Sequence, residues 1–343
     1  MGLNPDLPRT AGGQRTRVAV AIDGGGSKTD AVAVDSTGGV LARARAGGSS
    51  PQNLGLDAAF AVIDGLVEQL RGQLAVTRLD RVHTYLSGVD LPEEYAAFRR
   101  AASAASWAPL DPGALVVEND LFALLRAGAD EPDVVAVVCG TGINAVGVRA
   151  DGATVRFPAL GNITGDWGGG WQLGEQALWH AARAVDGRGP ATSLTESVPV
   201  SFGVDSVDHL IRELHFGRLP VDALSSLAPV VFEAAAAGDA VAGAIVDRQA
   251  EEIVILASTT LRRLELLDAD VPVVLGGGVI ASGDERLMGG IRQGLAEHAP
   301  RARIREVRTA PVVGAALLAA TAIGADAEAL ARLESELAPA RVG

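Results

Sequence analysis

Lysine is almost missing from this chain of 343 residues: of its 29 basic residues, Lys28 alone is a lysine and the others are arginines. Acidic residues are in excess, and the formal net charge is −13. A face that binds nucleic acid needs clustered cations, and a helix that lies on a membrane needs a basic amphipathic stretch. The sequence has neither, so we expect neither nucleic acid nor a membrane as a partner.

Cysteine is limited to Cys139, which excludes a disulfide framework and a metal site built from several cysteines. The sequence has no run of about 18 apolar residues free of charge or glycine, and its N-terminus lacks the pattern of a signal peptide. We therefore expect a soluble, cytoplasmic protein. Residues 1–16 show no periodicity and are predicted to form a disordered tail.

The rest of the chain is long enough for two domains, and its pattern repeats. Short β-branched runs separated by glycine turns predict an antiparallel meander over 17–46, and the same order of strands and turns recurs over 134–157. The recurrence favours two related halves, with two unrelated α/β domains as the alternative. The expected domains are 17–121 together with 311–343, and 122–310. Helices are expected over 54–74, 93–105, 175–187, 208–214, 227–236, 240–266 and 311–324, and further strands over 81–90, 115–120 and 271–278.

Three glycine clusters lie at the ends of predicted strands. Backbone N–H groups of such turns can converge on an anionic oxygen, and the missing Cβ atoms let a phosphate approach. The first cluster is neither a Walker A motif nor GxGxxG, and a glycine-rich hairpin with a surface lysine is its alternative. Asp23, just before it, is a candidate magnesium ligand acting through water. The predicted ATP- and phosphate-binding residues are Gly24, Gly25, Gly26, Ser27, Lys28, Thr29, Gly140, Thr141, Gly142, Gly276, Gly277 and Gly278.

Five segments carry a family resemblance by their order: DGGGSKT, ENDLFALLRAG, CGTGIN, GDWGGGWQLG and LGGGVIAS. They resemble the N-acetylglucosamine and glucosamine kinases and the related BadF/BadG-type activator ATPases, within the superfamily of sugar kinases, actin and heat-shock chaperones. The resemblance covers about Arg17 to Gly324. It implies a duplicated ribonuclease-H-like α/β fold, two domains around a nucleotide and sugar cleft, and a homodimer. It also implies that Lys28 is a phosphate-loop residue, a role that suits a point charge on a flexible stem.

Asp120 lies at the junction between a predicted strand and a predicted helix. Phosphoryl transfer to a hydroxyl group needs a carboxylate that orients the nucleophile and accepts its proton, with magnesium offsetting the developing charge. Asp120 matches the catalytic position of the family, and we predict that it is this base. Its alternative role is to cap the following helix, which aspartate does well.

The segments that bind the sugar in this family have a different sequence here. The segment GDEGSG reads GDWGGG here, so Asp166 is kept while Trp167 replaces a glutamate. Asp166 and Glu175 are the carboxylates that could face the amine of an amino sugar, which favours glucosamine over N-acetylglucosamine. A solvated helix position for Glu175 and a core position for Trp167 are the alternatives. The predicted sugar-binding residues are Ser50, Gln52, Asn53, Asn119, Asp120, Asn144, Asp166, Trp167 and Glu175.

The cysteine count weakens two rival functions. An activator ATPase needs two cysteines in each subunit for its iron–sulfur cluster, and a zinc-containing glucokinase needs several. A non-catalytic sugar sensor could also keep the nucleotide loops, and it stays open as a rival function. A filament-forming protein would keep the loops too, but it would not need Asn119 and Asp120 beside Asn144 and Asp166. We expect a kinase that uses ATP and Mg²⁺ to phosphorylate the 6-hydroxyl of an amino sugar, with position 6 implied by the resemblance alone.

Overall fold

The structure, a computed structural model, describes residues 17–74, 79–307 and 309–338. The chain divides into two compact units, one running up to Asp130 and resuming at Thr309, the other beginning at Glu131. The sequence placed this boundary after residue 121. It falls later because helix α4 (Leu121–Gly128) packs closely on α12 (Pro311–Ala322). The predicted tail, 1–16, lies outside the described residues.

The first unit contains a five-stranded sheet with the order β3-β2-β1-β4-β5. The first three strands form an antiparallel meander, while β4 and β5 run parallel to β1. The carboxyl ends of β1, β4 and β5 therefore meet at one edge of the sheet. The strands are β1 (Val18–Gly24), β2 (Lys28–Asp35), β3 (Val40–Gly47), β4 (Arg81–Leu86) and β5 (Leu115–Asn119).

The second unit repeats this topology. Its sheet has the order β10-β9-β6-β7-β8, with an antiparallel meander from β6 to β8 and with β9 and β10 parallel to β6. Counted within each unit, both sheets have the strand order 3-2-1-4-5. The two units are related halves, as a duplicated ribonuclease-H-like fold requires. The strands are β6 (Val134–Cys139), β7 (Ile143–Val148), β8 (Thr154–Arg156), β9 (Pro272–Gly276) and β10 (Arg303–Glu306).

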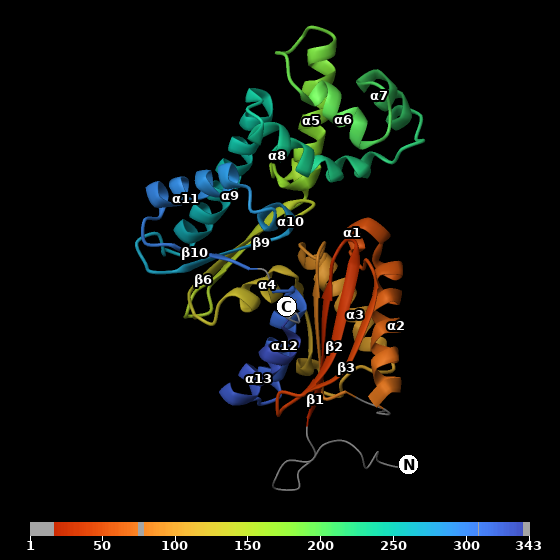
Figure 1. Ribbon diagram of the computed structural model, residues 1–343. Helices are drawn as coiled ribbons and strands as arrows, with labels where there is room; N and C mark the ends of the chain where they lie inside the picture. Colours follow the sequence, from red (N-terminus) through yellow and green to blue (C-terminus); the bar gives the residue numbers. More distant parts are fainter. Residues whose placement is uncertain (1–16, 75–78, 308, 339–343) are drawn as a thin grey trace. The chain divides into compact units, whose positions relative to one another are not determined.

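Helices cover both faces of the first sheet (Figure 1). Strand β1 alternates between two buried sets. Val18, Val20 and Ile22 face α2 (Leu56–Leu74) and α3 (Pro92–Ala104), while Ala19 and Ala21 face α12 and α13 (Ala327–Leu337). The small residues on the second side let helices approach closely. A Cβ atom on Gly314 of α12 would lie 1.9 Å from the Ala123 carbonyl oxygen of α4. The other helices of this unit are α1 (Pro51–Leu54), α2 (Leu56–Leu74), α3 (Pro92–Ala104), the 3₁₀ helix η1 (Pro112–Ala114) and α13 (Ala327–Leu337).

The second unit builds its core around the long helix α9 (Ala240–Arg263). Asp239 caps this helix by accepting hydrogen bonds from the amides of Val241 and Ala242, each at 2.9 Å. The other helices are η2 (Gly161–Ile163), α5 (Gly169–Val185), α6 (Leu194–Ser201), α7 (Val207–His215), η3 (Val221–Leu227), α8 (Ala228–Ala236), α10 (Gly278–Ala281) and α11 (Glu285–His298).

Within the described residues no single helix is both long and apolar enough to cross a membrane. Val221–Ala236 and Ala240–Arg263 reach that length and composition only as a pair, with a bend of 117° between them.

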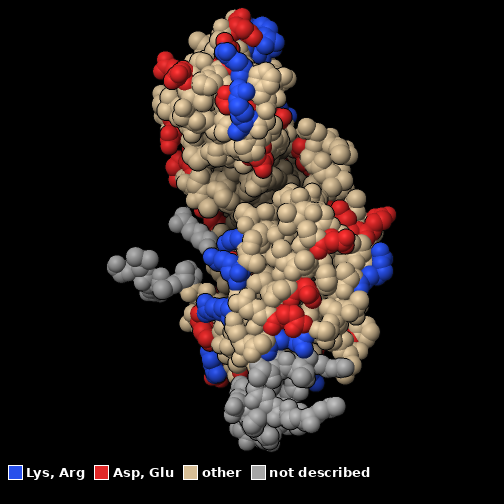
Figure 2. Space-filling view, turned by 90° about the vertical axis from the view of Figure 1, so that its right-hand side faces the viewer, with Lys and Arg blue, Asp and Glu red and all other residues tan. Residues whose placement is uncertain are grey.

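Surface charges of both signs are interspersed on the face drawn in Figure 2. Several arginines pair with carboxylates, for example Arg286 with Asp247 at 2.6 Å and Arg218 with Glu213 at 2.8 Å. Exposed pairs of this kind add little to stability, because water and salt screen their attraction. The stability of the fold therefore rests mainly on its buried apolar clusters.

Candidate functional site

The first glycine turn joins β1 to β2, and the segment after β3 packs closely against it. The amide of Gly25 donates to the carbonyl oxygen of Lys28 at 2.8 Å and closes the turn. A Cβ atom on Gly24 would lie 2.3 Å from Ser49 Oγ, and one on Gly48 would lie 2.2 Å from the Gly26 carbonyl oxygen. Gly26 and Ser27 are exposed, so the tip of the turn is open to a ligand.

Lys28 is half-exposed beside a buried carboxylate. Its Nζ lies 3.5 Å from Asp30 Oδ2, and Arg45 binds the other oxygen of the same carboxylate. Because Arg45 holds Asp30 independently, the ammonium group of Lys28 can turn toward a phosphate without leaving Asp30 unpaired. A flexible lysine suits this position better than an arginine, whose planar fork prefers one fixed geometry.

Asp23 at the end of β1 and Asp120 after β5 form a pair of half-buried carboxyl groups. Burial raises the pKa of Asp23 to about 8, helped by the negative charges of Asp120 and Asp30 and opposed by Lys28. Burial also raises the pKa of Asp120 to about 6, against the lowering effect of the amides of residues 120 and 121. A cation at this edge of the sheet would relieve the repulsion between the two carboxylates.

The helix cap after β5 is supplied by Asn119. The amide of Leu121 donates to Asn119 Oδ1 at 3.0 Å, and the side chain of Asp120 makes no capping hydrogen bond. A role of Asp120 as a helix cap stays the alternative to its role as a base. Asn119 itself is only 5% exposed, and its amide donates to Asp90 Oδ1 at 2.8 Å. Little of its side chain is left to meet a sugar.

The segment after β3 approaches the same edge of the sheet. The amide of Ser49 donates to the Gly25 carbonyl oxygen at 3.0 Å. Ser50 is buried, whereas Gln52 and Asn53 are exposed, and Asn53 Nδ2 lies 3.1 Å from the place where a Cβ on Gly26 would be. The first unit therefore gathers all of its predicted site residues around the ends of β1, β4 and β5.

The sequence reasoning missed Asp90, which lies in the loop after β4. It accepts hydrogen bonds from both Asn119 and Gln52, two of the predicted sugar-binding residues. A signal for it exists in the sequence: Asp23 lies near the end of β1, and an aspartate follows closely after β4 and after β5.

Two of the predicted glycine turns meet in the second unit. The turn 140–142 is tied to the start of α5, since the amide of Gly170 donates to the Gly140 carbonyl oxygen at 2.7 Å and that of Trp171 to the Thr141 carbonyl oxygen at 2.9 Å. Gly277 has a φ of +97°, and a Cβ there would lie 2.3 Å from the Cys139 carbonyl oxygen. Gly276 is the buried last residue of β9. The first predicted turn belongs to the other unit.

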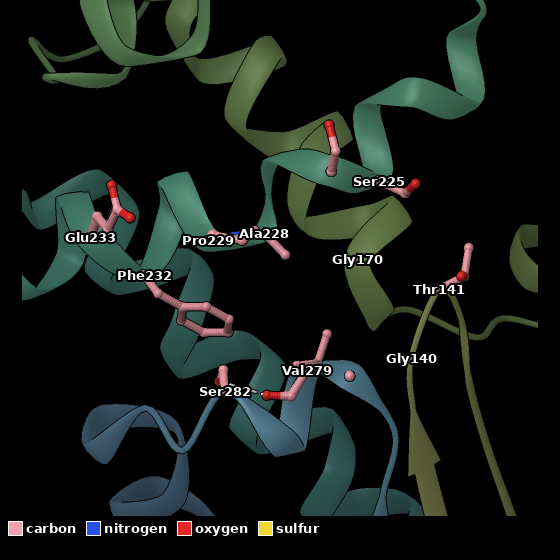
Figure 3. A pocket seen from close by; sticks show the side chains of 12 residues that line it. Gly140, Thr141, Gly170, Ser225, Ala228, Pro229, Phe232, Glu233, Val279 and Ser282 are labelled. Atoms are coloured by element: carbon pink, nitrogen blue, oxygen red, sulfur yellow. Dashed lines mark hydrogen bonds between the residues drawn. The ribbon is translucent and has the colours of Figure 1, made fainter. Parts of the chain in front are cut away.

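A pocket of about 630 Å³ opens beside these two turns. Phe232 and Pro229 of α8 and Val279 of α10 give it apolar walls (Figure 3). Ser282 lies at its base, where its hydroxyl donates to the Val279 carbonyl oxygen at 2.7 Å. Its lining consists of Gly140, Thr141, Gly170, Ser225, Ser226, Ala228, Pro229, Phe232, Glu233, Gly278, Val279 and Ser282. Pockets that hold small ligands span about 300–1,000 Å³ and are mostly apolar.

Glycines of α5 shape one side of this pocket. A Cβ on Gly174 would lie 1.8 Å from the Leu224 carbonyl oxygen, and one on Gly170 would lie 2.9 Å from the Ser225 carbonyl oxygen. Only glycine lets η3 lie directly on α5, which brings Ser225 to the pocket. The spacing of these two glycines, one helical turn apart, is the sequence signal for this contact.

The predicted sugar residues of the second unit have mixed surroundings. Trp167 is 9% exposed and packs beneath Arg248, whose guanidinium carbon lies 4.1 Å from the ring centroid. It is a core residue rather than an open wall for a pyranose. Asp166 is half-buried and accepts a hydrogen bond from the Thr164 hydroxyl. Asn144 on β7 and Glu175 on α5 are half-buried as well.

Residues 17–74, 79–307 and 309–338 contain no cluster of three or more His, Cys, Asp or Glu side chains that could hold a metal ion. Mg²⁺ commonly uses only one or two protein carboxylates together with substrate phosphates. The pair Asp23 and Asp120 fits that smaller requirement.

The repeated sheet topology and the glycine turns at strand ends define a protein of the sugar-kinase and actin-like ATPase class. The sequence profile of the BadF/BadG/BcrA/BcrD ATPase family matches residues 20–319. The chain belongs to this family, and both the predicted family and the predicted fold are confirmed.

The chain is similar to several sugar kinases. An N-acetyl-D-glucosamine kinase of Dictyostelium discoideum is 29% identical over 320 residues, which cover 88% of this chain and 97% of the relative. An N-acetylmuramic acid/N-acetylglucosamine kinase of Clostridium acetobutylicum is 24% identical over 305 residues, covering 88% and 98%. Among solved structures, a protein from Chromobacterium violaceum assigned as an N-acetylglucosamine kinase has a TM-score of 0.68 and 25% identity, covering 88% of this chain and 99% of that one. The relatives support the expectation of an ATP-dependent hexosamine kinase.

Proposed function

We propose that this chain is an ATP-dependent kinase that phosphorylates the 6-hydroxyl group of N-acetylglucosamine. The observation that carries the proposal is Asp120, a half-buried carboxyl with a pKa near 6 at the edge of the sheet where the glycine turn and Lys28 also lie. A base with this pKa is ionised at neutral pH and still able to accept a proton from an attacking hydroxyl.

The chemistry follows from the groups at this edge. Asp120 accepts the proton of the sugar hydroxyl while that oxygen forms its bond to the γ-phosphorus of ATP. The bond between the γ-phosphorus and the β,γ-bridging oxygen breaks, and ADP leaves with the electron pair. The turn from Gly24 to Lys28 offers backbone amides and one cation to the transferred phosphoryl group.

The nucleotide base is assigned to the pocket of the second unit. Phe232 and Val279 would contact its flat faces, and the turn Gly140–Gly142 would lie toward the phosphates. Bound Mg²⁺ would neutralise phosphate charge, and Asp23 is the residue proposed to hold it, directly or through water. A homodimer and a cytoplasmic location stay predictions from the sequence.

The preferred substrate proposed here is N-acetylglucosamine, in place of the glucosamine expected from the sequence. The sequence-based preference for glucosamine depended on Trp167 lining the pocket and on Asp166 and Glu175 facing an amine. Trp167 is instead held in the core by Arg248, and Asp166 is engaged by Thr164. The names of both relatives include N-acetylglucosamine, which supports an acetylated sugar here.

The test is the initial rate of ADP release with Mg²⁺ and ATP on N-acetylglucosamine, glucosamine, N-acetylmuramic acid, glucose and no sugar. We expect the highest kcat/KM for N-acetylglucosamine. A higher value for glucosamine would overturn the substrate assignment. ATP hydrolysis that does not depend on sugar would overturn the assignment as a kinase.

A further inference from the structure

Asp90 has no assigned role, yet its side chain joins two parts of the proposed sugar site. Its Oδ1 accepts a hydrogen bond from Asn119 Nδ2 at 2.8 Å, and its Oδ2 accepts one from Gln52 Nε2 at 3.1 Å. The loop that carries it is fixed in turn by Glu94, whose Oε2 accepts from the amides of Asp90 and Leu91 at 2.8 Å each. One carboxylate therefore bridges the segment after β3 and the end of β5.

The bond to Asn119 sets the direction of that amide. Asn119 Nδ2 also lies 3.4 Å from the Val89 carbonyl oxygen, and its Oδ1 accepts from the Leu121 amide. A reversed amide would bring its oxygen against the Asp90 carboxylate and its N–H groups against the Leu121 N–H. The charge of Asp90 thus selects the orientation in which Asn119 caps α4, the helix that begins directly after Asp120.

The bond to Gln52 acts across a close contact between two loops. Gly88 has a φ of +75°, and a Cβ there would lie 2.5 Å from Ser50 Oγ and 2.9 Å from Gln52 Cγ. Such a contact keeps the loop after β4 against the segment that carries the predicted sugar residues Ser50 and Gln52. Movement of that segment would therefore be transmitted to Asp90 and to Asn119.

We propose that Asp90 is a positioning residue that holds Asp120 and the Ser50–Asn53 segment in the geometry needed for sugar phosphorylation. This inference rests on the proposed function. Asp90 acts through Asn119 and Gln52, so its loss should affect the sugar and the transfer step. The nucleotide pocket lies in the other unit and should keep its affinity.

The test uses Asp90→Asn, which keeps the size of the side chain but places an N–H group against one of the two amide donors. We expect kcat to fall about tenfold or more and KM for the sugar to rise about fivefold, since misplacement of about 1 Å can cost a hundredfold in rate. KM for ATP should stay within about twofold. Glu93→Gln is the matched control, because Glu93 is an exposed neighbour in the same segment, and it should leave all three values unchanged.

The double variant Asp90→Asn/Asn119→Asp provides a rescue. The amide introduced at position 90 can donate to the carboxylate introduced at position 119 and still accept from Gln52. That carboxylate can also accept from the Leu121 amide. We expect the double variant to regain at least half of the lost kcat. If the single variant does not fold, the kcat of the double variant still tests the positioning role of Asp90.

Three outcomes would overturn the proposal: wild-type kinetics in Asp90→Asn, a rise in KM for ATP equal to the rise in KM for the sugar, or no recovery of kcat in the double variant. The side-chain amide resonances of Asn119 and Gln52 give a readout that does not depend on activity, and both should shift in Asp90→Asn but not in Glu93→Gln. If the wild type phosphorylates no amino sugar, the proposed function fails, while these resonances still test the two hydrogen bonds.

Discussion

Replacement of Asp23 by Asn should make the stability of the first unit less dependent on pH. Burial and the charges of Asp120 and Asp30 raise the pKa of Asp23 from 3.8 to about 8. The folded protein therefore keeps this proton at pH values where the unfolded chain has lost it. The stabilisation is fully present below about pH 4 and is lost as the pH rises toward 8. An amide at this position imitates the protonated acid and does not titrate.

The size of the effect follows from one proton. Between pH 5 and 7 the wild type should lose about 1.4 kcal/mol of stability per pH unit relative to Asp23→Asn, or about 2.7 kcal/mol over that range. At roughly 2–4 °C per kcal/mol, the Tm difference between the two proteins should grow by about 5–10 °C. Burial lowers the pKa of His83 to about 4, which makes stability rise with pH, but both proteins retain this histidine and its effect cancels.

The assay is thermal unfolding followed by circular dichroism at pH 5, 6 and 7 in a chelating buffer. Asp57→Asn, which alters an exposed carboxylate of α2, is the control and should differ from the wild type by the same amount at every pH. A Tm difference for Asp23→Asn that also stays constant with pH would refute the reasoning. It would mean that Asp23 is ionised in the folded protein at pH 5.

Three further substitutions, and one control on α11, test other parts of the site. Asp120→Asn should fold normally and lose about 10²–10⁴-fold in kcat, the contribution typical of a positioned general base; a kcat within twofold of wild type would reject that role. Phe232→Ala should raise KM for ATP about tenfold, through loss of contact with the base, and leave KM for the sugar unchanged. Gly174→Ala would place a Cβ 1.8 Å from a backbone oxygen of η3 and should cost about 1–3 kcal/mol in thermal unfolding. Gly289→Ala on α11 meets no neighbouring atom within 4 Å, and it should be neutral or stabilising.

The parts of the site that the sequence predicted are those with local signals. A strand followed by several glycines predicts a tight turn from a few neighbouring residues, and the structure has such turns at Gly24–Lys28 and Gly140–Gly142. The repeated meanders were visible for the same reason. The strand order of each sheet follows once those meanders are paired with the later parallel strands.

The parts that the sequence did not predict depend on distant contacts. Asp90 meets partners 29 and 38 residues away, and Trp167 is covered by Arg248 of α9. The sequence around Asp90 or Trp167 does not predict these contacts. Strand β10 was also missed, because Arg303–Glu306 reads as alternating charge, and Arg305 finds its partner in Glu131 far along the chain.

The boundary between the units shows the same limit. The pattern after Asp120 predicts a helix that begins at the strand end, but it does not say which unit that helix joins. Gly314 decides this by letting α12 touch the backbone of α4. The sequence alone gives no sign that these two helices are in contact.

The central claim is that Asp120 promotes transfer of the γ-phosphoryl group of ATP to N-acetylglucosamine. Its most direct test is a paired product analysis by ³¹P NMR, in which wild-type protein and Asp120→Asn are incubated with ATP, Mg²⁺ and the sugar. We predict equal amounts of ADP and N-acetylglucosamine 6-phosphate from the wild type, and almost none of either from the variant. ADP formed without a phosphorylated sugar, or equal product from both proteins, would contradict the account.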